Sequence, residues 1–287
     1  MSVTTFARPA AGGRLAWQFI AGPGISRRVG VIGIAVIVLA AVFAPLLTPY
    51  DPIALNAGGL QAPSTLHPLG TDQLGRDSLA RLLYGARIDL LIGFLGVTFP
   101  LIIGATIGLI AGFYGRWVDT VVGRLVDIFV AFPSLVLVIA VVAVLGPGLR
   151  NFFIAVTLVS WTAYARIIRA ETLTVKNREY VLAARALGYG NLRIMFRHVL
   201  PNVIAPAFVF GMSDFVLDIL AGASLGFFGL GVPAPTPEWG VMIAEGRSFV
   251  LIAPWLVLFP GLAIIVVGFF FSLLGDGLAD SVRHVEQ

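Results

Sequence analysis

The residues with the clearest potential for chemistry are Asp214 and Asp218, two acids one helical turn apart in the middle of an apolar run. A carboxylate inside a bilayer is costly unless it faces water or a partner, so we expect both side chains to face a cavity. Three uses fit such a pair: lining a solute pathway, relaying protons, or serving as the acids of an intramembrane aspartyl protease. The protease is disfavoured because its two acids come from different helices, and the solute pathway is the favoured interpretation.

Two enzyme motifs are incomplete in this chain. Residues 222–226 have the Gly-x-Ser-x-Gly pattern of a hydrolase nucleophile, which requires a strand–turn–helix setting and a His/Asp pair. Here the pattern lies within an apolar helical run, and the only histidine after it is His284. A phosphate-binding P-loop requires Gly-Lys-Ser/Thr, whereas the single lysine, Lys176, follows a valine. We therefore expect no catalytic residue and no ATP site.

Metal and cofactor sites are not indicated. The chain has no cysteine, which excludes thiolate ligands. Its three histidines are far apart in the sequence: His67, His198 and His284. We expect this chain to bind neither a metal nor a cofactor.

The composition identifies the kind of elements that carry these residues. Of the 287 residues, 58% are hydrophobic and only 12% are charged, and the mean hydropathy is +0.96. Soluble domains carry about 25% charged residues, so the chain is predicted to be an all-α integral membrane protein. Runs of about 20 apolar residues, enough to cross a bilayer, predict six transmembrane helices, at about 29–47, 88–113, 125–145, 152–169, 203–230 and 251–274.

Positive charge predicts the orientation. With the N-terminus in the cytoplasm, fourteen Arg and Lys residues fall in cytoplasmic segments and five in external ones. Cytoplasmic loops carry such an excess, so both termini are predicted to be cytoplasmic. We divide the chain into a cytoplasmic tail (1–28), a first transmembrane helix with an external loop (29–86), and a core with five helices (87–287).

Small residues predict a close helix contact within the membrane. Gly104, Gly108 and Gly112 recur every fourth residue, which places a smooth stripe on one face of the second predicted helix. Such stripes allow neighbouring backbones to approach closely.

A polar, basic stretch interrupts the apolar runs at residues 178–200. Its first half is predicted to be a helix from Arg178 to Leu187, capped by Asn177 and ended by Gly188 in a left-handed turn.

A second short helix is predicted to begin at Asn191. Its apolar face would comprise residues at i, i+3, i+4 and i+7: Leu192, Met195, Phe196 and Val199. An amphipathic loop of this kind fits either a docked partner or an anionic lipid surface.

The same stretch resembles the cytoplasmic coupling loop of ABC-importer permeases. Ala183, Ala184, Gly188, Leu200 and Pro201 match that family's Glu-Ala-Ala…Gly…Leu-Pro pattern, although Leu182 replaces its glutamate and His198 a later isoleucine. The resemblance implies contact with an ATPase through a loop at about 171–201. The residues it points to are Glu179, Tyr180, Ala183, Ala184, Arg185, Leu187, Gly188 and Pro201.

Three further segments resemble the C-type permease subunit of dipeptide and oligopeptide importers. The run from His67 to Asp77 is predicted to be a structured external loop, followed by a short helix capped by Asp77 or Ser78. With the two later segments, the resemblance covers nearly the whole chain from about residue 27. The later segments are residues 228–240 and 273–278.

This resemblance implies a type I importer permease fold in a bacterial cell membrane. Its implied partners are a homologous second permease, two cytoplasmic ATPase domains that bind ATP and Mg²⁺, an extracytoplasmic binding protein and membrane lipid, but no nucleic acid. The implied substrates are peptides, with nickel, glutathione or another small solute as alternatives. A proton-coupled carrier using the two mid-membrane acids is a further alternative. Candidates for docking the binding protein are Asp72, Arg76, Asp77, Glu238 and Trp239.

Overall fold

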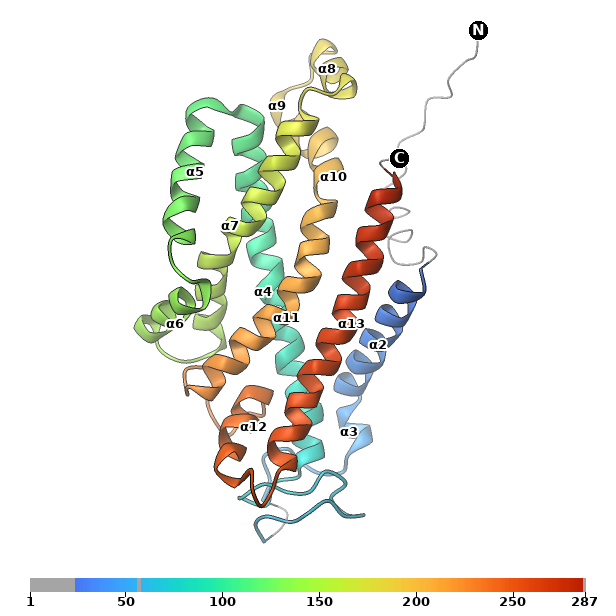
Figure 1. Ribbon diagram of the computed structural model, residues 1–287, viewed down its shortest axis with the longest axis vertical. Helices are drawn as coiled ribbons and strands as arrows, with labels where there is room; N and C mark the ends of the chain where they lie inside the picture. The colour runs from blue at the N-terminus through green and yellow to red at the C-terminus, as the bar shows by residue number, and fades with distance from the viewer. Residues whose placement is uncertain (1–23, 56–57, 286–287) are drawn as a thin grey trace.

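A computed structural model describes residues 24–55 and 58–285, with side chains to residue 280. Most of the predicted tail, residues 1–23, and the side chain of His284 lie outside this part. The described residues form helices and loops, with one isolated β-bridge between Thr71 and Asp77 (Figure 1). The α-helices are α2 (Ile25–Val42), α3 (Ala44–Leu47), α4 (Ser78–Tyr114), α5 (Arg116–Val130), α6 (Ser134–Leu145), α7 (Leu149–Val175), α8 (Glu179–Ala186), α9 (Asn191–Ile194), α10 (Leu200–Val203), α11 (Ala205–Phe227), α12 (Trp239–Gly246) and α13 (Trp255–Val285).

Six membrane crossings are accounted for if one of them is bent. Five helices are long and apolar enough to span a bilayer: α2, α4, α7, α11 and α13. The remaining predicted span, 125–145, corresponds to the pair α5 and α6, which meet at 84°. Pro133 precedes α6, and a proline both lacks an N–H and disfavours helix in the residue before it. The residues of the predicted third span therefore form two helices with a sharp bend before Ser134.

Helix α4 differs most from its prediction. Asp77 caps it as expected, because the Asp77 carboxylate accepts a hydrogen bond of 2.7 Å from the Ala80 amide. However, the short external helix predicted to follow continues into the membrane span as one helix of 37 residues. At 1.5 Å per residue it is about 55 Å long, which exceeds the bilayer core. The division at residues 86 and 87 consequently falls inside α4.

The glycine stripe of α4 makes the predicted close helix contact, and its partner is α7. A Cβ added at Gly104 or Gly108 would overlap the carbonyl oxygen of Trp161 or Ala165, respectively. At Gly112 it would lie 2.7 Å from the Thr172 Cβ. At Gly104 and Gly108 the two backbones are therefore in direct contact, and only glycine leaves enough space.

Replacing Gly108 with valine should separate α4 from α7, because the obstacle is the α7 backbone and cannot move aside. We expect a loss of about 1–3 kcal/mol, the usual cost of overpacking, seen as a lower midpoint of thermal unfolding in detergent. Gly123→Val is the matched control, since nothing lies within 4 Å of a Cβ at Gly123. Equal midpoints for the two variants would contradict the packing argument.

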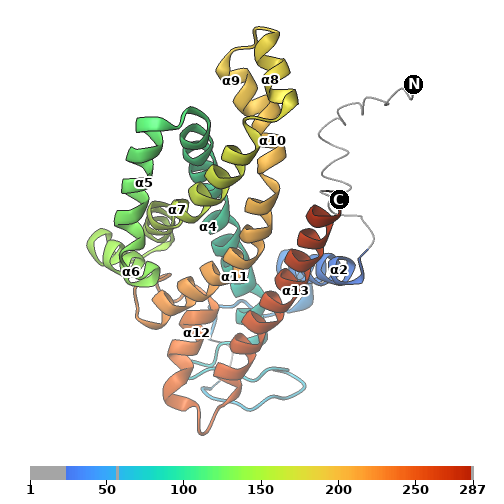
Figure 2. The same ribbon diagram turned by 45° about the horizontal axis from the view of Figure 1, so that its top comes forward.

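The long helices form one bundle with a small helical layer at each end (Figures 1 and 2). Helices α8, α9 and α10 lie at one end, and α12 and the loop before α4 lie at the other. Helix α2 packs against α13 and α4, and α11 packs against α4 and α13. Candidate functional residues therefore gather at both ends and at mid-height.

The predicted orientation can be tested on the natural, cysteine-free chain. Ser64, in the loop before α4, and Asn191, at the start of α9, are both exposed. Single cysteines at these positions should differ in their labelling by a membrane-impermeant thiol reagent on intact cells. Position 64 should be labelled, and position 191 should be protected. After the membrane is permeabilised, both should react. Labelling of position 191 from outside would reverse the orientation.

Candidate functional site

The turn after α8 has the predicted backbone. Gly188 has a φ of +77°, the left-handed region that glycine adopts without strain. The Gly188 amide donates to the Arg185 carbonyl (2.9 Å), and the Tyr189 amide donates to the Ala184 carbonyl (3.2 Å). These two bonds form a Schellman motif, which satisfies carbonyls at the helix end. The N-terminal prediction is wrong, because Arg178 is the N-cap residue in place of Asn177.

The second short helix is irregular, and its predicted apolar face is wrong. Helix α9 passes into a π-helix at Met195–Val199 and then into α10. The buried side chains are Ile194, Met195 and Val199, whereas Leu192 and Phe196 are 68% and 45% exposed. The wider π-turn rotates the face that packs inward, and Asn191 is the first helical residue rather than the cap.

Buried side chains fasten this layer to the bundle. Val181 and Ala184 of α8 lie in one hydrophobic cluster with Ile194 and Met195 and with residues of α4 and α7. The ends of α4 and α7 are also tied by the Lys176 ammonium, which donates to the Gly112 carbonyl at 2.9 Å. Helices α8 and α9 therefore pack directly on the ends of α4 and α7.

The outward side of the same layer is apolar and basic. We define the coupling surface by its exposed apolar residues: Tyr180, Leu182, Leu187, Leu192 and Phe196. Partial burial raises the pKa of the Tyr180 phenol, although the charge of Arg178 opposes the shift. With the exposed Arg185, Arg193 and Arg197, these side chains give the layer its apolar and basic outer side.

The eight residues named for ATPase contact divide between the two sides. Ala184 is buried, whereas the other side chains and the Gly188 turn are exposed: Glu179, Tyr180, Ala183, Arg185, Leu187, Gly188 and Pro201. The Arg185 guanidinium lies 5.2 Å from the centre of the Phe113 ring. Contact of these residues with an ATPase stays a prediction.

The mid-membrane acids are buried between helices of this subunit, and their role in a solute pathway stays a prediction. Asp214 and Asp218 are 8% and 4% exposed on the face of α11 that packs against α4 and α7. The Tyr164 hydroxyl donates to the Asp214 carboxylate at 2.7 Å. Gly96 lies against Asp218, where an added Cβ would overlap the carboxyl oxygen. Glycine at position 96 therefore lets α4 pack closely over the Asp218 side chain.

The proposed nucleophile motif is ordinary helix. Ser224 lies inside α11, and its hydroxyl donates to the Leu220 carbonyl at 2.7 Å. Nearby Gly226 serves packing, because an added Cβ would lie 2.5 Å from a carboxyl oxygen of Glu238.

At the end opposite α8, charged residues predicted to dock a partner are buried among themselves. We define the cap network as Asp72, Arg76, Arg81 and Glu245. The Arg76 guanidinium lies 2.6 Å from the Asp72 carboxylate and 2.8 Å from that of Glu245. Arg81 also pairs with both acids, and its contact with Glu245 is 2.8 Å. These pairs join the loop before α4 to α12, so they hold the structure together.

The remaining docking candidates are also buried. The Asp77 carboxylate lies 2.8 Å from the His67 ring nitrogen. Glu238 caps α12, because its carboxylate accepts hydrogen bonds from two backbone amides at 2.7 and 2.8 Å. Trp239 donates its indole N–H to the Leu82 carbonyl (3.1 Å). Asp72, Arg76, Asp77, Glu238 and Trp239 are all at most 4% exposed, which disfavours direct contact of their side chains with a binding protein, and that role stays a prediction.

Sequence reasoning missed the acid that holds α12 in place. Asp89 of α4 is fully buried and accepts a hydrogen bond of 3.1 Å from the Trp239 amide. Burial raises the pKa of the adjacent Glu238, and its two amide hydrogen bonds oppose that shift. The sequence does contain one signal that could have identified Asp89: it is a lone acid in an otherwise apolar run after Arg87.

Comparisons with known proteins give consistent results. The family model described as binding-protein-dependent transport system inner membrane component matches residues 104–284. The dipeptide transport system permease protein DppC of Alkalihalophilus pseudofirmus is 48% identical over 255 residues, covering 88% of this chain and 84% of the relative. The glutathione transport system permease protein GsiD of Salmonella typhimurium is 44% identical over 252 residues, covering 86% and 82%.

One solved structure supports the fold. A chain of the inward-facing MetNI methionine ABC transporter superposes with a TM-score of 0.55 at 20% sequence identity, covering 72% of this chain and 97% of that one. At this level of identity the likeness concerns the arrangement of helices alone.

Proposed function

The chain belongs to the family of binding-protein-dependent transport system inner membrane components, and we propose that it is the permease subunit of an ATP-driven importer of short peptides. The predicted importer-permease fold and membrane location are confirmed by the family match, the helix arrangement and the apolar spans. A homologous second permease, two cytoplasmic ATPase domains and an external binding protein complete the proposed assembly.

The observation that supports a peptide substrate is the similarity to dipeptide permeases over most of the chain. It includes both the segments around the cap network and the layer at α8 to α10. No residue chemistry in the described subunit selects a peptide by itself, so we assign solute choice chiefly to the binding protein.

The coupling surface supports an ATP-driven cycle. Its apolar side chains face outward, while buried residues of the same layer pack on α4 and α7. We infer that an ATPase docks on this surface and that its closure on ATP pushes α8 to α10. ATP and Mg²⁺ bind the partner, since the single lysine lacks a P-loop context.

Glutathione is the second candidate substrate, because one relative of 44% identity is named for it. Nickel and other small solutes stay alternatives from the sequence resemblance. A proton-coupled carrier is disfavoured, since Asp214 and Asp218 are packed inside the subunit.

The test is uptake by the complete transporter. The chain should be co-expressed with its partner subunits, reconstituted, and supplied with dipeptides, tripeptides, longer peptides, glutathione or Ni²⁺. We expect ATP-dependent uptake of dipeptides or tripeptides and none without ATP. Uptake of glutathione or Ni²⁺ alone would replace the peptide assignment, and uptake driven by a pH gradient without ATP would overturn the importer.

A further inference from the structure

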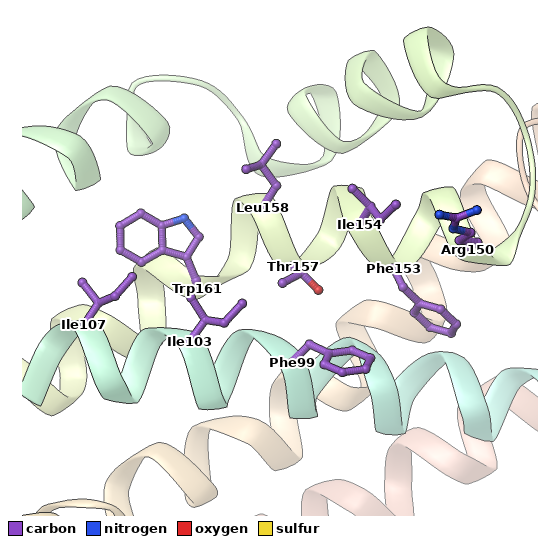
Figure 3. Close-up of a pocket in the computed structure, with 9 residues that line it drawn as sticks. All are labelled: Phe99, Ile103, Ile107, Arg150, Phe153, Ile154, Thr157, Leu158 and Trp161. Atoms are coloured by element: carbon purple, nitrogen blue, oxygen red, sulfur yellow. The ribbon is translucent and has the colours of Figure 1, made fainter.

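A groove between α4 and α7 has an amphipathic character that the proposed function does not use. We define the α4–α7 groove by Phe99, Ile103, Ile154, Leu158, Trp161 and, at one end, Arg150. Its volume is about 630 Å³, and Figure 3 shows the side chains along the two helices with Arg150 at the far end from Trp161. Every lining residue except Arg150 and Thr157 is apolar.

The charges of α7 place this groove at the depth of the hydrocarbon. Between Arg150 and Arg166 the helix carries no Asp, Glu, Lys or Arg. Sixteen residues of helix rise about 24 Å, close to the thickness of a bilayer core of about 30 Å. Arg150 therefore lies near one membrane interface, where the guanidinium reaches headgroups.

The mouth of the groove favours an anion. Arg150 is exposed, and no acidic residue lines the groove. The N-terminus of α7 adds to the positive potential, since it has Gly148 as N-cap, no side-chain cap and no acid in its first turn. From Arg150 to Trp161 the groove follows eleven residues of helix, a length of about 16 Å.

A peptide fits this surface poorly. Its amine and amide groups would lose water in an apolar groove that offers them few partners, which is costly. A molecule with an anionic head and a long apolar tail matches both the mouth and the length.

We propose that the α4–α7 groove binds one membrane phospholipid, with its phosphate paired to Arg150 and one acyl chain lying along the groove to Trp161. The guanidinium can donate two parallel hydrogen bonds to phosphate oxygens. The acyl chain would cover exposed apolar surface such as Phe99 and Ile103, which are 45% and 40% exposed. This site is independent of the transported solute.

Quenching by brominated lipid tests the proposal on the assembled transporter in nanodiscs. A bimane label is attached to a cysteine at Leu158, on the groove, or at Val144 of α6, which is 86% exposed outside it. Phosphatidylglycerol with brominated acyl chains is then titrated in. A sample without the introduced cysteine corrects for labelling of partner subunits.

The label at position 158 should be quenched at a mole fraction of brominated lipid well below that needed at position 144. Arg150→Gln should raise the required fraction about tenfold at position 158, the scale of one charged hydrogen bond, and leave position 144 unchanged. Brominated diacylglycerol, which lacks phosphate, should quench the label only weakly at both positions. Equal curves at the two positions, or no effect of Arg150→Gln, would reject the site. Absence of quenching at position 158 would show that another subunit covers the groove.

Discussion

Gly188→Val is expected to remove the ATPase subunits from the purified transporter while the permease still inserts into the membrane. The φ of +77° at this position is strained for a β-branched residue, and such strain costs about 1–3 kcal/mol. Nothing lies within 4 Å of an added Cβ, so the effect would come from the backbone alone. The two Schellman hydrogen bonds would break, and α8 and α9 would lose their relative placement.

The measurement is the amount of ATPase that co-purifies with tagged permease, together with ATP-dependent uptake. We expect uptake to fall by about fivefold to 150-fold, the factors that correspond to about 1–3 kcal/mol of strain. Gly190→Val is the matched control two residues away, since Gly190 has an extended backbone and open space around it. Undiminished ATPase binding by Gly188→Val would refute the coupling assignment.

Asp72→Asn should destabilise the fold more than any other single change considered. It leaves the Arg76 and Arg81 guanidinium groups, each 2% exposed, with Glu245 as their one remaining acid in the cap network. Breaking a buried pair by removing one partner costs about 3–5 kcal/mol. The variant should show a much lower midpoint of thermal unfolding and little folded protein in the membrane.

Asp51→Asn is the control for this prediction, because Asp51 is an exposed acid in the same loop whose carboxylate accepts only local hydrogen bonds. Its free energy of unfolding should stay within about 0.5 kcal/mol of wild type, so its midpoint of thermal unfolding should be nearly unchanged. A normal midpoint for Asp72→Asn, or a binding-protein defect with an intact fold, would instead favour the docking role predicted from the sequence.

Features set by near neighbours in the chain were predictable. Gly188 ends α8 and Asp77 begins α4, because each acts on backbone groups within a few residues. The glycine stripe of α4 likewise follows from helical spacing, although the sequence did not name α7 as its partner. The face of the second coupling helix was mispredicted because a π-turn, which packing supports, shifts the register after Ile194.

The sequence by itself determined the class of this protein: a membrane permease with apolar spans and a basic, amphipathic stretch between two of them. The tertiary structure alone decided which polar side chains are exposed and which are buried against a distant partner. Arg76 meets Glu245 across 169 residues of chain, and Trp239 meets Asp89 across 150. A charge is exposed or buried according to whether a distant partner compensates its desolvation, and local pattern carries no information about that partner.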